Sequence, residues 1–495
     1  MRVPFAEQGR LDCPPIEAVV LNVNCRDEII PILRALQHVY SQPQLRRAIL
    51  DLIGKDVNRD SRADCGREGM DYWTILVLAA VRLGCNYDYD KLQDLAEQHR
   101  TLRQMMNIGD WQAEEDFSWR WIRDNVCLLR PSTLEKINHL LVAAGHKVAP
   151  KAIEAVRGDT FVVETNVHYP TESTLIEDGL RQVVTLAAKL AKARGLPGWR
   201  QHEHLLRKVK QAVRYIGRAS RAKNQGADRL KPGYERLLAL AEDLLQRARA
   251  LLTTLHFRAR DPGIDWLGEG LPGLRAELWH FLQLTEKVCG TARRRVLLGE
   301  SVPNEEKIFS IFEPHTELIK RGKQPNPIQY GHNVLVIEDA VGFICHYEVL
   351  ANGVLDQAVV VPAMTALQER VGGKIKRASF DRAFHTPENQ ERLAKIVKHP
   401  CIPMKGPNLG RKQQEEASMA FRQARQSHPG IESAIGALEA GNGQERCRDK
   451  SKLGYERYVG LGILGRNLQV LGKLLLAQDD AACEAAKSKR KRRAS

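Results

Sequence analysis

Three acidic side chains stand at the ends of predicted secondary-structure elements. Asp159 begins a predicted strand, Asp381 directly follows another, and Glu432 opens a predicted helix. Such positions can bring side chains from distant segments to one crevice while the elements behind them stay rigid. Carboxylates are the ligands that Mg²⁺ prefers, and two Mg²⁺ ions about 3.5–4 Å apart can activate a nucleophile and neutralise a phosphodiester transition state. The three acids therefore predict a two-metal site for phosphodiester chemistry.

Each acid also has an ordinary structural explanation when it is taken alone. Asp is a common turn former at the end of a strand, and Glu in a first helical turn interacts favourably with the helix dipole. Three histidines, His168, His385 and His428, lie near the acids in the sequence. They lack the H-x₃-H or H-E-x-x-H spacing of a zinc site, so hydrogen bonding or DNA contact is their expected role. The metal-site interpretation therefore depends on the surrounding sequence.

Helical and strand patterns follow one another along the chain. Apolar residues recur at three- and four-residue spacing from about 28 to 148, which predicts helices that include 72–83, 90–106 and 117–129. A strand pattern starts after Gly158, helical periodicity returns from 177 to 298, and strand patterns resume after Pro303. We predict strands at 159–166, 307–312, 333–338, 342–350, 358–361, 374–380 and 401–404, and helices at 365–371, 390–398, 431–438 and 458–476.

This order predicts an α+β protein whose mixed-sheet core is split in the sequence. We expect a helical N-terminal domain at 1–150, a core formed by 151–176 and 304–478, a basic helical insertion at 177–303, and a disordered basic tail at 479–495. Strands that belong to one sheet but are separated by a long helical segment imply that the segment was inserted into the core. The tail would add affinity for phosphate without reading any base.

The charge of the chain favours a polyanionic partner. The 495 residues include 75 Lys and Arg against 60 Asp and Glu, a formal net charge of +15. Within the predicted insertion, five cations spaced three or four residues apart share one helical face: Arg207, Lys210, Arg214, Arg218 and Arg221. Their mutual repulsion would be relieved by phosphate contacts, and between 189 and 223 Glu203 is the only acid. A DNA-binding face is the prediction, and a solvated helix face is the alternative.

Other features favour a protein that works in the cytoplasm. The longest aliphatic run, 75–81, is too short to span a bilayer, and the first residues lack the basic-then-apolar pattern of a signal peptide. The ten cysteines form no C-x-x-C pair. We expect reduced thiols, mostly in the core, rather than a zinc ribbon or a redox motif.

Local sequence around the three acids is similar to that of a known enzyme family. The segment 157–173, RGDTFVVETNVHYPTES, resembles the first catalytic strand of DDE-type insertion-sequence transposases, which belong to the ribonuclease H-like, retroviral-integrase superfamily. The segment 378–389, ASFDRAFHTPEN, resembles the second block of that family. The third block is resembled by 430–435, GIESAI, with RYVGLG at 457–462 and NL at 467–468 downstream. The similarity extends to the N-terminal region, including DFSWRW at 116–121.

This resemblance implies a fold, a reaction and partners. The fold would be a ribonuclease H-like catalytic domain interrupted between its first and second strands, preceded by an N-terminal domain for DNA-end binding and assembly. Asp159, Asp381 and Glu432 would be catalytic ligands of two Mg²⁺ ions, for which Mn²⁺ can substitute. The enzyme would cleave DNA at transposon ends and transfer the 3′-hydroxyl into target DNA. Its partners would be terminal inverted repeats, target DNA and further copies of the chain, as a homodimer or a larger assembly in the nucleoid.

The third block departs from the family pattern and leaves one alternative residue. Related transposases often carry Tyr, Arg and Lys at offsets of minus seven, minus four and plus seven from the last acid, where this chain has Arg425, His428 and Glu439. Glu439 lies on the same helical face as Glu432 and is the alternative third acid. Two other functions are compatible with the same core: a nuclease that cuts without joining, and a DNA-binding remnant whose acids no longer bind metal.

Overall fold

The computed structural model shows the α+β class predicted from the sequence. It describes residues 2, 11–25, 27–59, 69–111, 117–221, 226–258, 271–320, 327–405, 410, 414 and 416–494, with side chains except at 226–229, 256–258, 271–272 and 489–494. The chain forms two compact units, Met1–Asn166 with Gly331–Ser495 (unit 1) and Val167–Tyr330 (unit 2). The N-terminal helices and most of the sheet therefore lie in unit 1.

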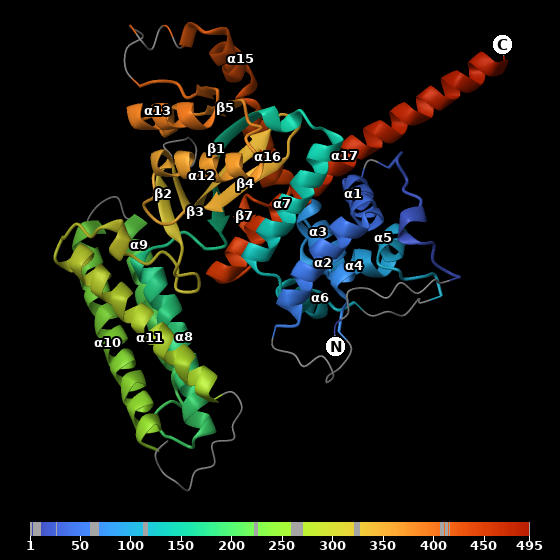
Figure 1. Ribbon diagram of the computed structural model, residues 1–495. Coiled ribbons are helices and arrows are strands. Elements are labelled where there is room, and N and C mark those ends of the chain that lie inside the picture. The colour runs from blue at the N-terminus through green and yellow to red at the C-terminus, as the bar shows by residue number, and fades with distance from the viewer. Residues whose placement is uncertain are drawn as a thin grey trace. The chain divides into compact units, whose positions relative to one another are not determined.

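A seven-stranded mixed sheet contains the long first strand at its centre (Figure 1). Its main path runs β2 (Glu317–Lys320), β3 (Ile328–Asp339), β1 (Ala155–Thr165), β5 (Arg377–Phe380) and β6 (His399–Cys401). In addition, β4 (Ile344–Val349) pairs with β3, and β7 (Arg446–Cys447) pairs with β1. Strand β1 is antiparallel to β3 and parallel to β5 and β7. Its run of buried Phe161, Val162 and Val163 suits a strand covered on both faces.

Helices α1 to α7 form the N-terminal part of unit 1. They are α1 (Ile29–Ser41), α2 (Pro43–Val57), α3 (Tyr72–Gly84), α4 (Tyr89–Gln98), α5 (Arg100–Met105), α6 (Trp119–Val126) and α7 (Pro131–Val148). The predicted helices at 72–83 and 117–129 are confirmed, with small differences in their ends. The helix predicted at 90–106 is two helices, because the His99 ring accepts the Leu102 N–H and starts α5 as an N-cap.

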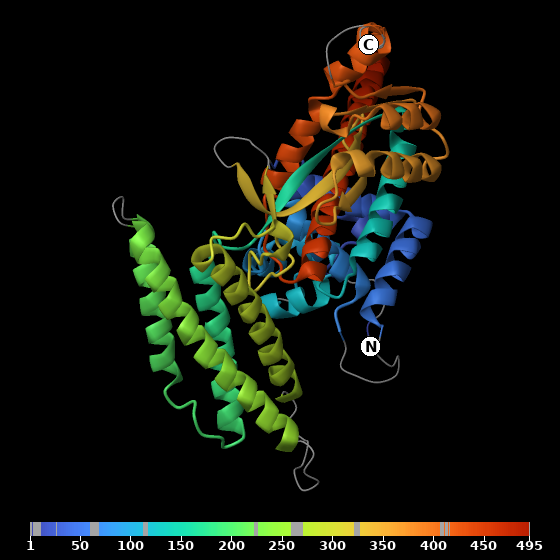
Figure 2. The same cartoon turned by 90° about the vertical axis from the view of Figure 1, so that its left-hand side faces the viewer.

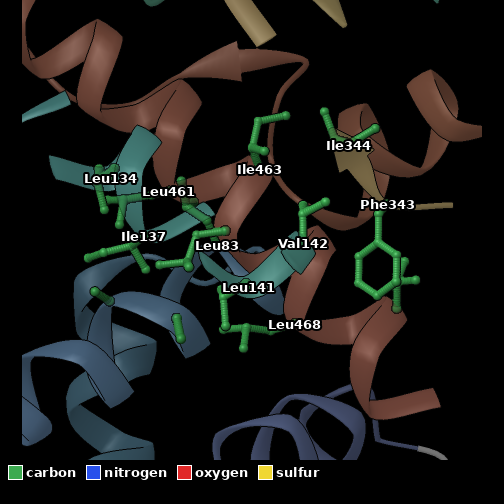
Figure 3. Close-up of a cluster of buried hydrophobic side chains, with 14 of the residues drawn as sticks. Leu83, Leu134, Ile137, Leu141, Val142, Phe343, Ile344, Leu461, Ile463 and Leu468 are labelled. Carbon is green, nitrogen blue, oxygen red and sulfur yellow. The ribbon is translucent and has the colours of Figure 1, made fainter. Parts of the chain in front are cut away.

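The core of unit 1 is built around the C-terminal helix α17 (Lys452–Ala494). Its apolar face packs on α1, α3, α7 and β4. Figure 3 shows this packing between α17, α7, α3 and the start of β4, with labelled side chains Leu461, Ile463, Leu468, Leu134, Ile137, Leu141, Val142, Leu83, Phe343 and Ile344. Gly84 and Gly465 let α3 and α17 approach closely, since a Cβ on Gly465 would lie 2.5 Å from the Gly84 backbone.

The buried part of α17 also explains its apolar composition. By length and hydropathy alone, residues Lys452–Ser488 could cross a membrane, but 78% of that apolar window is buried inside the protein. Beyond Leu476 the helix is exposed and extends past the rest of unit 1 (Figure 1). The expectation of a disordered tail from 479 is therefore wrong for its backbone, which stays helical to Ala494. The side chains from 489 onward lie outside the described residues.

Several predicted strands differ from the structure. Residues 358–361 lie in helix α12 (Asp356–Arg370), where buried Val360, Met364 and Leu367 follow a helical period that overrides the β propensity of valine. Residues 307–312 form no strand and follow the short turn η4 (Asn304–Glu306). The first strand begins at Ala155, so Asp159 lies within it rather than at its start.

The remaining described elements of unit 1 are three helices and three 3₁₀ turns. They are α13 (Pro387–Ile396), α15 (Met419–Ser427), α16 (Gly430–Gly441) and the 3₁₀ turns η1 (Ile16–Ala18), η2 (Ala152–Glu154) and η5 (Arg382–Phe384). The predictions at 390–398 and 431–438 correspond to α13 and α16. The nine described cysteines are all free thiols, and most of them are buried, as predicted.

Unit 2 contains four long helices with a core of their own. These are α8 (Glu172–Ala193), α9 (His202–Arg221), α10 (Gly226–Arg258) and α11 (Leu271–Ala292), followed by the π-helical turn η3 (Arg293–Leu297). Figures 1 and 2 show the four helices side by side. Thr171 caps α8 by accepting the Thr174 N–H. Buried Val209, Val213 and Ile216 form the inner face of α9, so its basic face points outward.

Candidate active site

Asp159 lies on β1, and Asp381 directly follows β5, the parallel neighbour of β1. Strands β1 and β5 keep one register from Ala155 opposite Arg377 to Gly158 opposite Phe380, and the two aspartates come one residue later. Neighbouring strands are about 4.8 Å apart, and residues in register point to the same face. The Phe380 ring occupies the space beside Gly158, where a Cβ would lie 2.5 Å from it, so those two residues face the opposite side. The two carboxylates therefore share one face of the sheet.

Local hydrogen bonds orient both aspartates. Asp159 accepts the N–H of Thr160 at 2.8 Å. Asp381 follows β5 directly and accepts the N–H of Ala383 at 3.0 Å, which caps η5. Each carboxylate thus accepts a hydrogen bond from a nearby backbone N–H, and a carboxylate can accept more than one.

Glu432 is carried to the same region by the start of α16. Residue 432 lies in the first turn of α16, which packs on β1, and its side chain is exposed. Between α15 and α16 stands His428, whose pKa is lowered to about 4 by burial and then by the charge of Arg425, so the ring is neutral near pH 7. The charges of Asp381 and Glu432 oppose this shift in the pKa of His428.

Glu439, the alternative third acid, lies toward the other end of α16. Seven residues along a helix correspond to about 10 Å, and this end of α16 approaches α3 instead. Asn442, directly after the helix, donates to the carbonyls of Leu83 and Gly84 at 3.0 and 3.3 Å. The geometry therefore favours Glu432 over Glu439 as the partner of the two aspartates.

The donor set suits a hard divalent cation. Asp381 and Glu432 are exposed, and among the described residues no cation forms an ion pair with either of them. Carboxylates that lie close together repel one another, and a divalent ion removes that repulsion. Oxygen ligands that leave open positions for phosphate are what Mg²⁺ sites in phosphoryl-transfer enzymes require. Asp159, Asp381 and Glu432 thus fit a shared Mg²⁺ site.

A second group of potential ligands, His146, Asp339 and Cys345, lies elsewhere in unit 1. One ligand atom from each lies within 4.8 Å of the others. However, Asp339 Oδ1 already accepts three backbone N–H groups, from 341 to 343, and Oδ2 is 2.9 Å from His146 Nε2. Burial and then the charge of Asp339 raise the pKa of the Cys345 thiol, which disfavours the thiolate that metals bind. This group is best explained as a hydrogen-bonded link between α7 and the turn from β3 to β4.

The basic face predicted in the insertion is present on α9. Its five cations are all exposed: Arg207, Lys210, Arg214, Arg218 and Arg221. None of them forms an ion pair within the described part of unit 2, whereas Arg249 pairs with Glu286 at 2.5 Å and Arg293 pairs with Glu242. From first to last cation the face spans about 21 Å at 1.5 Å per residue. Cations kept apart from acids in this way present a continuous positive surface.

Two residues that the sequence did not single out support the site. Arg157 and Ser379 each stand two positions before an aspartate, on the same face of the sheet as that aspartate. Arg157 Nη1 donates to the Ser427 carbonyl at 2.8 Å, and Ser379 Oγ lies 3.0 Å from His428 Nδ1. The two-residue period of a strand is the signal that could have identified them.

Compared with protein-family models, curated proteins and solved structures, the chain gives no significant match.

Proposed function

We propose that the protein is a metal-dependent DNA transposase of the DDE type. The observation that carries the proposal is the register of β1 and β5, which pairs Gly158 with Phe380, the residues directly before Asp159 and Asp381. The start of α16 adds Glu432 on the side of His428. We further infer that the core is ribonuclease H-like. Strand β1 is central and has an antiparallel and a parallel neighbour, and in the sequence the helices of unit 2 lie between β1 and the other strands.

In this proposal the three carboxylates act as ligands and position the reacting groups. Two Mg²⁺ ions, or Mn²⁺ in their place, would supply activation of the nucleophile and neutralisation of charge on the phosphate. Asp159 would contribute one ligand from β1, Asp381 a second from the end of β5, and Glu432 a third from the start of α16. A water molecule first displaces the 3′-oxygen at the transposon end. The freed 3′-hydroxyl then attacks a target phosphodiester in line and displaces its 3′-oxygen.

DNA is the proposed partner, in two roles. The net charge of +15 and the unpaired cations of α9 favour phosphate contacts with the transposon ends or with the target. Joining requires two terminal inverted repeats to be held together with the target, so we propose a homodimer or larger assembly on DNA, in the cytoplasm at the nucleoid.

The test is a strand-transfer assay with purified protein, Mg²⁺ and duplexes that cover the DNA on both sides of the coding sequence, where transposon ends would lie. The expected result is joined product, lost by roughly 10³-fold in Asp159→Asn and in Asp381→Asn. Glu388→Gln is the matched control, since Glu388 is an exposed acid of α13 paired with Arg392 at 3.3 Å. It should retain activity.

The outcomes separate the proposal from its alternatives. Cleavage without joined product from a pre-cleaved end would identify a nuclease on the same core. A DNA-binding remnant would bind duplex DNA but show no Mg²⁺-dependent product, or a product that the two Asp→Asn variants leave unchanged.

A further inference from the structure

The junction between α15 and α16 is attached to the sheet at two points. It consists of His428 and Pro429, and Glu432 follows within the first turn of α16. One attachment comes from Arg157 on β1 and the other from Ser379 on β5. Each of these residues precedes its strand's aspartate by two positions. The two strands that carry Asp159 and Asp381 therefore also hold the segment that carries Glu432.

The Arg157 attachment is rigid because the guanidinium is fixed on both sides. Nε and Nη2 each lie 2.7 Å from Glu338 Oε2, and the side chain of Glu338 is only 2% exposed. This leaves Nη1 aimed at the Ser427 carbonyl at 2.8 Å. The guanidinium also fills the space beside Gly430, where a Cβ would overlap it. The first residue of α16 is thus held against Arg157 at contact distance.

The second attachment is buried and independent of the first. His428 is 8% exposed and its Nδ1 lies 3.0 Å from Ser379 Oγ. Ser379 is itself 2% exposed, so this hydrogen bond is shielded from water. Two hydrogen bonds from different strands restrict both the distance of the junction from the sheet and its rotation relative to the sheet. Metal ligands must hold their geometry within about 0.5 Å, which is the restraint that such attachments provide.

We propose that Arg157 and His428 are positioning residues, which hold the α15–α16 junction on β1 and β5 so that Glu432 can share metal ions with Asp159 and Asp381. This inference rests on the proposed function. It extends that function by naming what fixes the third ligand. Loss of such supporting contacts typically weakens metal affinity roughly 10–100-fold.

The test is direct Mn²⁺ binding, measured from the electron paramagnetic resonance signal of free Mn²⁺ during titration of the full-length protein. The site is defined as the binding that Asp159→Asn removes. We expect Arg157→Met and Ser379→Ala each to weaken this binding by roughly 10-fold or more. Ser379→Ala removes a single hydroxyl, so it decides the question if Arg157→Met does not fold.

Arg466→Met is the matched control. Arg466 also faces Glu338, at 3.9 Å, but no contact joins it to the α15–α16 junction among the described residues. It should keep wild-type Mn²⁺ affinity even if its melting temperature falls. Wild-type affinity in both Arg157→Met and Ser379→Ala, or an equal loss in Arg466→Met, would overturn the positioning role alone. A wild-type protein without Asp159-dependent Mn²⁺ binding would overturn the proposed function and this inference together.

Discussion

Asp159 on β1 and Asp381, directly after β5, each lie one residue beyond the paired residues Gly158 and Phe380. The backbone hydrogen bonds of the two strands set this relationship between the two positions. The third acid depends on a helix instead, and it is placed by contacts with those strands. This difference leads to separate expectations for each part of the site.

The identity of the third acid can be tested by replacing each candidate with its amide. We expect Glu432→Gln to reduce Mg²⁺-dependent DNA cleavage by roughly 10²-fold or more, because it removes a charged ligand. Glu439→Gln should change the rate little, because Glu439 lies two helical turns beyond Glu432, toward the end of α16 that contacts α3. Cleavage rates measured over a Mg²⁺ titration check this. The opposite ranking of the two variants would assign the role to Glu439.

The basic face of α9 predicts a particular salt dependence of DNA binding. If Arg214 and Arg218 each contact a phosphate, the double Ala variant should flatten the plot of log affinity against log salt by about two units. Fluorescence anisotropy with a duplex of arbitrary sequence measures this slope. Arg249→Ala with Arg293→Ala is the matched control, since these arginines are paired with Glu286 and Glu242. Equal slopes in the two double variants would mean that α9 has no special role.

Folding stability should fall in acid partly because of His428. Its pKa is lowered to about 4 by burial and by the charge of Arg425, from an ordinary value of 6.5. Between those values the unfolded chain binds a proton that the folded protein does not, so stability falls as pH drops from 6.5 to 4. His428→Gln, which can keep a hydrogen bond to Ser379, should lose less stability over this range in urea unfolding experiments.

His139 contributes to the pH dependence of stability in both the wild type and His428→Gln. Its pKa is also lowered to about 4, by burial and then by the charge of Arg370, and it is present in both proteins. Identical pH profiles for the wild type and His428→Gln would show that His428 is not held neutral.

A glycine-to-alanine substitution should have opposite effects at two sites. One is Gly465, where α3 and α17 approach closely, and the other is Gly436 on α16. Gly465→Ala would place a Cβ 2.5 Å from the Gly84 backbone, and we expect it to destabilise the protein by about 1–3 kcal/mol. Gly436→Ala on α16 meets no atom within 4 Å and should stabilise the protein by about 0.5–1 kcal/mol, since Ala favours helices. Thermal unfolding measures both. A neutral Gly465→Ala would mean that the two helices can separate without cost.

Parts of the fold that depend on local sequence were predicted well. Helix α3 follows its apolar run and its Asp71 cap, and α9 follows the separation of its apolar and basic faces. Residues 358–361 show the limit of such signals. A short valine-rich run fits a buried strand or a buried helix equally well, and packing within the core made it part of α12.

By itself, the sequence determined which side chains carry charge, which helices have two distinct faces, and which three acids are candidates for a metal site. The tertiary structure decided that β1 and β5 pair in a register that ends one residue before Asp159 and Asp381, and that Arg157 and Ser379 contact the segment between α15 and α16. These relationships join residues far apart along the chain. Strand register and long-range hydrogen bonds arise from the packing of the whole unit, so no local pattern encodes them.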